Sequence, residues 1–212
     1  MKFGFTEEES NIITDVLLLS DLYGIESHGM QRLARYHKGI EKGLIKVDAK
    51  PEVVFETPVS AVIEGNDGMG QLLGYKAMNL AIEKAKQTGM AIVTVRNSNH
   101  YGIAGYYATM ATKAGLIGMT GTNARPSIAP TFGVENMMGT NPLTFAMPTD
   151  EPFPFMLDCA TSITQNGKIE YYARMGMDTP AGMVVGRDGK AHTDSVAILN
   201  ELNTAQAALA PL

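Results

Sequence analysis

The amino-acid sequence predicts an α/β fold in which a helical N-terminal segment precedes a region of alternating helices and strands. Three observations support this prediction. Apolar side chains recur at helical spacing over residues 7–22, two short β-like runs lie within residues 53–63, and helix and strand patterns alternate over residues 70–121. The chain has 212 residues, 45% of them hydrophobic and 18% charged, which is enough to bury a sizeable core.

The N-terminal segment is predicted to contain two helices. Thr6 and Glu9 have the spacing of a capping box, so we expect a helix from about residue 7 to residue 22 that ends near Gly24. A second helix is expected to begin after Ser27-His28-Gly29, because apolar side chains again follow at helical spacing.

The middle of the chain is predicted to alternate between strands and helices. Short joins between the later elements favour a βαβ crossover, formed by strand 90–96, helix 103–114 and strand 116–121. The preceding elements are expected to be strands at 53–55 and 61–63, joined by a turn at Thr57-Pro58, and a helix over 70–89.

The later part of the chain is more irregular, because several prolines and glycines interrupt it. Strands are expected near 143–147 and 155–158. A helix is expected over about 162–174, with Thr161 or Ser162 as its N-cap. A hairpin turn at 184–190 and a helix near 194–204 complete the predicted elements.

Composition and charge exclude several classes of protein. The formal net charge is −5, and no cluster of Lys and Arg with interleaved aromatic residues suggests a nucleic-acid partner. No apolar run has the roughly 18 residues that a membrane-spanning helix needs, and the acidic start MKFGFTEEES is unlike a signal peptide. The single cysteine, Cys159, cannot form an internal disulfide, so we expect a cytoplasmic protein.

Familiar catalytic motifs are absent from the sequence. There is no Gly-x-Gly-x-x-Gly after a strand, because Gly65-Asn-Asp-Gly68-Met-Gly70 has a different glycine spacing. Walker, His-Glu-x-x-His, Cys-x-x-Cys and Gly-x-Ser-x-Gly patterns are also missing. We therefore expect no metal site and neither a metal-dependent nor a serine hydrolase.

Two of the four histidines stand among small polar residues at predicted element boundaries, whereas His37 and His192 are expected at the surface. Ser27 and His28 precede Arg32 by about one helical turn, and the Arg32 guanidinium suits a carboxylate. Tyr36 lies one turn further along the same face. The alternative interpretation is that Ser27 is an N-cap followed by solvated charges.

The second histidine, His100, lies in Asn97-Ser98-Asn99-His100-Tyr101-Gly102, between a predicted strand and a predicted helix. An imidazole there could exchange a proton near neutral pH, although an ordinary turn with His100 filling a gap is an equal alternative. Small-residue corners at 139–142 and 158–162 could present N–H groups to a phosphate or a carboxamide. For the second corner, a capped helix start is the alternative.

Four ordered motifs closely resemble the malate/L-lactate dehydrogenase family, which also includes ureidoglycolate dehydrogenase and diketogulonate reductase. They are Ser27-His28-Gly29-x-x-Arg32, residues 97–102, Gly139-Thr140-Asn141-Pro142 and Asp158-x-Ala160-Thr161-Ser162. The resemblance covers essentially the whole chain. It implies an N-terminal helical substrate-binding segment at residues 1–50 and a mixed-sheet, non-Rossmann NAD(P)-binding domain at residues 51–212.

The activity implied by this resemblance is hydride transfer between NAD or NADP and C2 of a small 2-hydroxy or 2-oxo acid of the malate, (S)-lactate or ureidoglycolate class. It implies two catalytic residues, His100 as the proton acceptor for the substrate hydroxyl and His28 beside it, where the matching histidine of some relatives has the donor role. The implied substrate-binding residues are Ser27, Arg32, Tyr36, Thr140 and Asn141. The implied cofactor-binding residues are Thr122, Asn123, Phe155, Met156, Leu157, Asp158, Cys159 and Ala160.

The resemblance also implies a homodimer, and it leaves two alternatives to a complete enzyme. Family chains are longer at both ends, so we expect the cofactor domain to be incomplete at its C-terminus. Some relatives place a polar residue where this sequence has Ala124, and Arg125 is the possible substitute. A truncated, inactive chain that binds a ligand or a partner is the first alternative, and a hydrolase using His28 and His100 is a weaker one.

Overall fold

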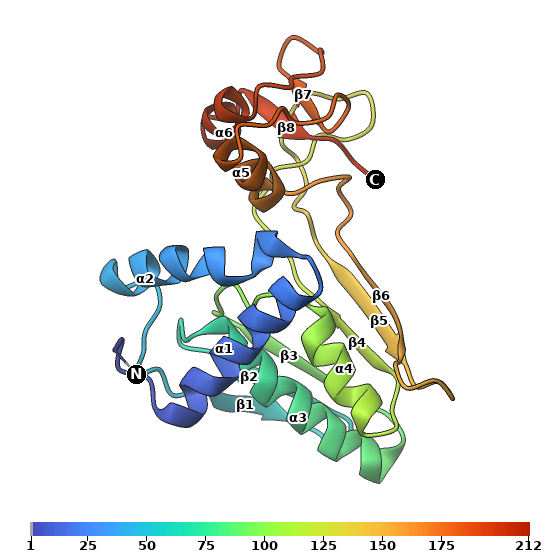
Figure 1. Ribbon diagram of the computed structural model, residues 1–212. Helices are drawn as coiled ribbons and strands as arrows, with labels where there is room; N and C mark the ends of the chain where they lie inside the picture. Colours follow the sequence, from blue (N-terminus) through green and yellow to red (C-terminus); the bar gives the residue numbers. More distant parts are fainter. Residues whose placement is uncertain (1) are drawn as a thin grey trace. The chain divides into compact units, whose positions relative to one another are not determined.

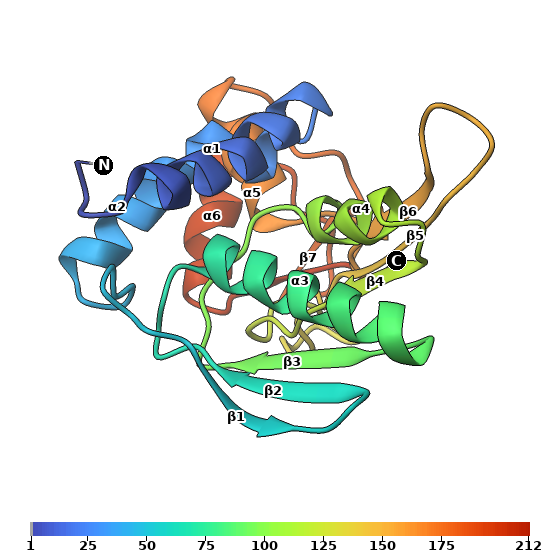
Figure 2. The ribbon, with the colours of Figure 1, turned by 90° about the horizontal axis from the view of Figure 1, so that it is seen from below.

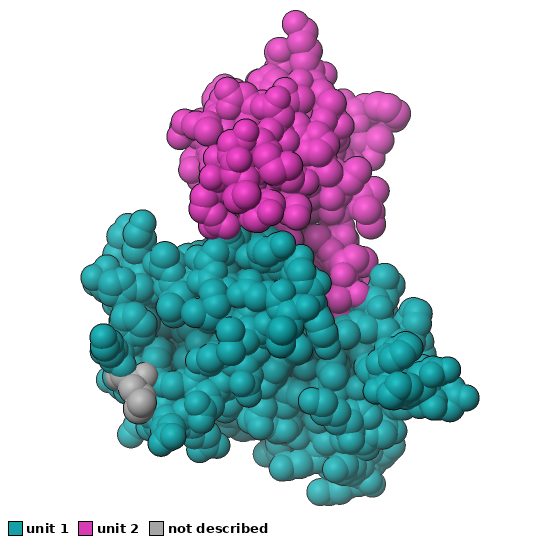
Figure 3. All heavy atoms as spheres, viewed as in Figure 1, with its two compact units in different colours: residues 1–120, 145–157 teal, residues 121–144, 158–212 magenta. Residues whose placement is uncertain are grey.

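The computed structural model describes residues 2–212, which form two compact units (Figure 3). The first unit contains the chain up to Thr120 together with Phe145–Leu157, and the second contains Gly121–Thr144 and Asp158–Leu212. These units are defined by contacts. The division at residue 50, into a substrate-binding segment and a cofactor-binding domain, remains a prediction.

The first unit contains the mixed sheet that the fold prediction requires. Strand β1 (Glu52–Glu56) is antiparallel to β2 (Ser60–Glu64), and β2 is parallel to β3 (Ile92–Arg96). A parallel pair needs a long crossover connection, and helix α3 (Gly70–Thr88) supplies it. The unit β2–α3–β3 is therefore a βαβ crossover, and the predicted α/β class is confirmed.

The crossover predicted over residues 90–121 is wrong, although its three elements exist. They are β3, α4 (Gly105–Lys113) and β4 (Gly118–Gly121), but β4 belongs to a different sheet, in the order β4-β5-β6. The pattern strand–helix–strand identified the elements without identifying which strands pair. Strands β5 (Leu143–Met147) and β6 (Phe155–Cys159) agree with the predicted strands to within one residue.

Helix α1 (Glu7–Leu22) has the predicted bounds and the predicted capping box. The Glu9 N–H donates to the Thr6 hydroxyl oxygen at 3.3 Å, and the Thr6 N–H donates to the Glu9 carboxylate at 2.8 Å. The predicted second helix begins later than expected. Two 3-10 turns, Glu26–His28 and Met30–Arg32, precede α2 (Leu33–Glu41).

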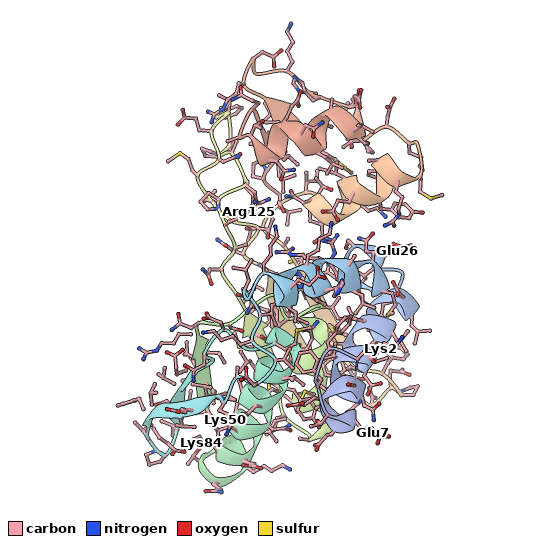
Figure 4. The ribbon with its side chains drawn as sticks, turned by 90° about the vertical axis from the view of Figure 1, so that its left-hand side faces the viewer. Lys2, Glu7, Glu26, Lys50, Lys84 and Arg125 are labelled. Carbon is pink, nitrogen blue, oxygen red and sulfur yellow. The ribbon has the colours of Figure 1, made fainter. Side chains whose placement is uncertain are left out.

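Helix α3 covers one face of the first sheet, and α1 and α4 pack against α3 (Figures 1 and 2). Lys84 of α3, labelled in Figure 4, pairs with the Glu56 carboxylate at 2.8 Å and donates to the Thr57 carbonyl oxygen at 2.7 Å. Two apolar clusters form the core of this unit. They contain Phe5, Ile13, Leu17, Tyr36, Ile45 and Met69, and Val16, Ile103 and Tyr107.

The second unit has a separate core and a two-stranded antiparallel sheet. Its elements are α5 (Asn166–Arg174), β7 (Val184–Gly186), α6 (Ser195–Asn203) and β8 (Ala207–Leu209), of which β8 was not predicted. The buried residues of the core are Ile128, Ile169, Val184, Ile198, Leu202, Ala207 and Leu209.

The helix predicted over 162–174 begins at Asn166, because the two expected N-caps have other partners. The Thr161 hydroxyl donates to the Thr140 carbonyl oxygen at 3.1 Å, and the Ser162 hydroxyl donates to the Thr164 carbonyl oxygen. Residues 162–165 therefore stay outside the helix. Among residues 2–212, no helix is long and apolar enough to cross a membrane.

Candidate functional site

The segment after β3 is held in a fixed conformation by two asparagine side chains. Asn97 has a left-handed backbone, with φ of 51°, and its side-chain amide donates to both Glu64 carboxylate oxygens at 2.9 and 3.0 Å. The Asn99 amide donates to three main-chain carbonyl oxygens at 3.1, 2.9 and 3.0 Å. These bonds place His100 where the segment meets the start of α3.

Two glycines allow the close packing around His100. A Cβ atom on Gly70 would lie 2.3 Å from the Asn99 carbonyl oxygen and 2.4 Å from that of His100, so only glycine fits here at the start of α3. Gly102 has φ of 83°, and a Cβ there would lie 2.5 Å from Val16. Gly70 and Gly102 therefore serve close packing around His100.

The His100 ring accepts hydrogen bonds at Nδ1. The Gly102 N–H donates to Nδ1 at 3.3 Å, and the Tyr36 hydroxyl oxygen lies 2.7 Å from the same atom. Because a backbone N–H can only donate, this network assigns the proton of the neutral ring to Nε2 and makes Tyr36 a donor. His100 is therefore part of a specific network, which argues against the ordinary-turn interpretation.

His28 lies against His100 and is bonded to Ser27. The two imidazole rings stack with centroids 5.1 Å apart and an interplanar angle of 26°. The Ser27 hydroxyl oxygen is 2.9 Å from Nδ1 of His28. Helix α2 begins after Arg32, without a side-chain cap, so the N-cap interpretation of Ser27 is wrong.

Burial and positive charge keep both histidines neutral at neutral pH. Burial, then Arg32, then Arg35 lower the pKa of His28 to about 4. Burial is also the largest cause that holds the pKa of His100 well below its usual range, followed by His28, Arg35 and Arg32. The charged groups that act on His28 are thus both guanidiniums, which is a suitable environment for an anionic ligand.

Tyr36 lies deep in the core, with 2% of its surface exposed. Burial raises the pKa of its hydroxyl to about 12, so Tyr36 is a neutral hydrogen-bond donor at neutral pH, while the Gln71 amide opposes this rise. Gln71 was not predicted as a site residue. The sequence feature that could have indicated it is its position directly after Gly68-Met69-Gly70, a segment whose glycine spacing does not match a dinucleotide-binding motif.

The other two histidines have structural environments of their own. The His37 side chain is 45% exposed and lies 3.4 Å from the Glu41 carboxylate, as expected for a surface residue. His192, also expected at the surface, is only partly exposed and bonds to the Glu201 carboxylate at 2.7 Å. This hydrogen bond is the largest cause that raises the pKa of His192, and Asp188 adds to it.

The second unit carries the predicted residues of the small-residue corners. The Asn141 side-chain oxygen accepts the Ala124 N–H at 3.0 Å, and the Thr140 carbonyl oxygen accepts the Thr161 N–H at 2.8 Å. These bonds fix the corner at residues 139–142. Thr122 and Asn123 are exposed at the end of β4.

Strand β6 and Ala160 directly after it contain the remaining predicted cofactor-binding residues. Phe155 and Leu157 expose 52% and 49% of their surfaces, whereas Met156 is partly buried. The Asp158 carboxylate accepts the Thr144 hydroxyl at 2.7 Å, and the following Cys159 and Ala160 are partly buried. Arg125, labelled in Figure 4, is exposed in the extended segment after β4.

The first unit thus brings together Ser27, His28, Arg32, Tyr36 and His100, whereas Thr140, Asn141 and most predicted cofactor contacts belong to the second unit. Two surface grooves of the first unit are lined by other residues and include neither histidine of the pair. No three His, Cys, Asp or Glu side chains group as metal ligands within residues 2–212. What the cluster offers is a proton-exchanging imidazole beside a buried guanidinium.

Comparison with known proteins gives a consistent result. The family profile described as malate/L-lactate dehydrogenase matches residues 1–212. A malate dehydrogenase of Pyrococcus horikoshii is 50% identical over 199 residues, which cover 94% of this chain and 55% of that protein. An L-sulfolactate dehydrogenase of Methanocaldococcus jannaschii is 43% identical over 193 residues, covering 91% of this chain and 56% of that protein.

Solved structures match as well. The crystal structure of malate dehydrogenase from Entamoeba histolytica superposes with a TM-score of 0.95 at 44% sequence identity, covering 99% of this chain and 58% of that one. Nearly all of this chain is matched, but it covers only a little over half the length of each of these relatives.

Proposed function

Because the chain belongs to the malate/L-lactate dehydrogenase family, we propose that it acts as an NAD(P)-dependent dehydrogenase of small 2-hydroxy acids. Relatives named for malate, sulfolactate and hydroxycarboxylates support this reaction class. The observation that carries the proposal is His100, whose Nδ1 is held by Tyr36 and Gly102 and whose ring stacks on His28. Malate, (S)-lactate and ureidoglycolate remain the candidate substrates.

Substrate binding is assigned to the cationic cluster of the first unit. Arg32 is 6% exposed and acts electrostatically on both histidines, so its guanidinium would bind the substrate carboxylate. Ser27 and Tyr36 would contact the rest of the acid. Thr140 and Asn141 are proposed as further substrate contacts, supported by the rigid corner that contains them.

The predicted cofactor residues have the chemistry that a nicotinamide nucleotide requires. The exposed Thr122 hydroxyl and Asn123 amide can bond a carboxamide or a phosphate, and the exposed rings and side chains of Phe155 and Leu157 can contact an aromatic base. Met156, Asp158 and Cys159 on the same strand, and Ala160 after it, would also contact the cofactor. When bound, NAD or NADP supplies or accepts the hydride at C2.

The proton follows the hydrogen bonds of His100. In reduction of a 2-oxo acid, Nε2–H gives its proton to the oxygen on C2, while Nδ1 takes the proton of the Tyr36 hydroxyl. Tyr36 then regains a proton from solvent. Oxidation reverses these steps. Tyr36 first gives a proton to solvent and the ring carries its proton on Nδ1; the substrate hydroxyl proton then passes to Nε2 as the Nδ1 proton returns to Tyr36, which is the proton-acceptor role implied for His100.

The test is the His100→Ala variant, assayed with 2-oxo acids against NADH and NADPH in a crossed screen. General acid–base catalysis typically contributes 10²–10⁴-fold, so kcat should fall by about that factor. The exposed His37→Ala substitution is the matched control and should leave kcat unchanged. Wild-type turnover by His100→Ala would refute the assignment of His100 as the proton-exchange group. The same screen distinguishes use of NAD from use of NADP.

Two properties of the whole protein are also proposed. We expect a cytoplasmic location, which the single cysteine supports, and a homodimer, which the family resemblance implies. Light scattering coupled to gel filtration measures the oligomeric state directly. A monomer at micromolar concentration would contradict the dimer.

A second candidate function is binding of a ligand or partner without catalysis, and an apolar sheet face favours it. Phe55 and Ile92 expose 57% and 64% of their surfaces. Their register partners, Val62 and Ser60, are two residues apart in β2, so both side chains lie on one face of the sheet. Calorimetry that detects 2-oxo acid binding, with no oxidation of NADH or NADPH, would support this alternative.

A further inference from the structure

Gln71 is a buried amide without a conventional hydrogen-bond partner. It is the second residue of α3, and none of its surface is exposed. Neither its Nε2 nor its Oε1 atom makes a hydrogen bond within the described part of the chain. A glutamine amide has two N–H donors and an acceptor oxygen, and burying them unused is unfavourable, so such a group calls for a functional explanation.

The surroundings of Gln71 connect it to His100. A Cβ atom built on Gly102 would lie 4.0 Å from Nε2 of Gln71, and Gly102 donates to Nδ1 of His100. The Gln71 amide also interacts with the Tyr36 hydroxyl, in the sense that lowers the Tyr36 pKa. A contribution of that sign is the one that an N–H group near the Tyr36 oxygen would make, although no Gln71 hydrogen bond within residues 2–212 meets the usual distance and angle limits. Gln71 therefore borders both groups that donate to Nδ1.

We infer that Gln71 is a positioning residue, whose amide N–H holds the Tyr36 oxygen as an acceptor and so directs the Tyr36 proton to Nδ1 of His100. The tyrosine O–H can rotate about its C–O bond, and a donor to the oxygen leaves its proton free to point at Nδ1. With Tyr36 and Gly102 both donating to Nδ1, the neutral His100 ring keeps its proton on Nε2. This inference deepens the proposed function. Its effect on kcat rests on the proposed function, whereas its effect on the His100 tautomer does not.

The chain of donors gives the proposal a direction. With the Gln71 N–H directed at the Tyr36 oxygen, the Tyr36 hydroxyl is aligned toward Nδ1 of His100, 2.7 Å away, and it can replace there the proton that leaves through Nε2. After that transfer the Tyr36 oxygen carries negative charge, and the Gln71 N–H would stabilise it. An apolar residue at position 71 would fill the space and lose both effects.

The direct test is the tautomer of His100, measured by ¹⁵N chemical shifts of the two ring nitrogens in wild type and in the Gln71→Met and Gln71→Glu variants. Wild type should carry the proton on Nε2. The Gln71→Met variant has a side chain of similar size and should show a mixture of tautomers. The Gln71→Glu carboxylate would compete as an acceptor for the Tyr36 proton, so it should shift the ring toward Nδ1–H.

The matched control is Gln87→Met, the same substitution at an exposed position of α3, which should leave the His100 shifts unchanged. Wild type with its proton on Nδ1 would overturn the inference, as would folded Gln71 variants that keep the wild-type tautomer. If Gln71→Met fails to fold, the isosteric Gln71→Glu variant and the wild-type spectrum still decide the question.

Kinetics separate positioning from substrate binding. Gln71→Met should lower kcat at least about tenfold and leave KM within about threefold, because Arg32 still binds the carboxylate. The tautomer measurement needs no turnover. If the Gln71 variants change the tautomer but the protein never oxidises NADH or NADPH, the Gln71 inference stands and the dehydrogenase proposal is rejected. If the protein turns over but the tautomer is unchanged in the variants, only the Gln71 inference is rejected.

Discussion

The substitution Tyr36→Phe isolates the hydroxyl that bonds His100. Tyr36 is 2% exposed and packs in the core with α1 residues such as Ile13 and Leu17, and phenylalanine keeps the ring in this packing. The oxygen that is removed lies 2.7 Å from Nδ1 of His100. The variant therefore tests one hydrogen bond with little change of buried volume.

The expected loss of stability is small. One hydrogen bond contributes about 0.5–1.5 kcal/mol, and Nδ1 of His100 still accepts the Gly102 N–H at 3.3 Å, so the acceptor is not left unpaired. The free energy of unfolding should thus fall by about 1 kcal/mol, which lowers the melting temperature by roughly 2–4 °C in a chain of this size. The proposed proton route assigns to Tyr36 the replacement of the proton at Nδ1, so the catalytic loss should be larger, and a fall in kcat of about 10²–10⁴-fold is expected.

The assay pairs steady-state reduction of 2-oxo acids with thermal unfolding followed by circular dichroism. Tyr23→Phe is the matched control, since Tyr23 is 52% exposed at the end of α1, and it should change neither quantity. If Tyr36→Phe keeps kcat within about twofold of wild type while its melting temperature falls as expected, the hydroxyl is structural and the proton route through it is refuted.

Three further predictions follow from individual contacts. Arg35→Gln removes one of the two charges that lower the pKa of His28, so the pKa measured by NMR titration should rise from about 4 toward its ordinary value. In Gly70→Ala the new Cβ would lie 2.3 Å from a backbone carbonyl oxygen, and urea unfolding should show a loss of about 1–3 kcal/mol. The raised pKa of His192 stabilises the fold at acidic pH, fully below about pH 6.5, and this contribution declines as pH rises through the folded-state pKa. Glu201→Gln should therefore destabilise the protein more at pH 5.5 than at pH 8.5 in the same unfolding assay.

Local sequence patterns predicted the regular elements well, because their causes are local. The capping box of Thr6 and Glu9 and the predicted end of α3 at Gly89 both agree with the structure. The start of α5 was wrong, since Thr161 bonds the carbonyl oxygen of Thr140, which is 21 residues away. Strand pairing failed for the same reason, because β4 pairs in a sheet whose other strands begin more than 20 residues later.

The site shows the same limit. Motif spacing identified His28 and His100 as unusual, but their stacking depends on the packing of a 3-10 turn against the segment after β3, where His100 lies 72 positions after His28. Gln71 belongs to no recognisable motif, and its complete burial depends on tertiary packing that the sequence pattern does not show. The surface assignment of His192 overlooked Glu201, whose carboxylate reaches it from α6.

The neutrality of the two stacked histidines fits a site that acquires its acid–base strength on binding. In the free protein, burial and two guanidiniums favour the uncharged rings. A carboxylate bound at Arg32 would offset that positive charge and raise the pKa of His100 toward the range in which an imidazole exchanges protons efficiently. By linkage, protonation of His100 must then tighten binding of the acid by the same factor. Under the proposed function, the guanidinium that would hold the substrate and the imidazole that would move its proton are coupled through one local field, with no carboxylate among the charges that act on His28.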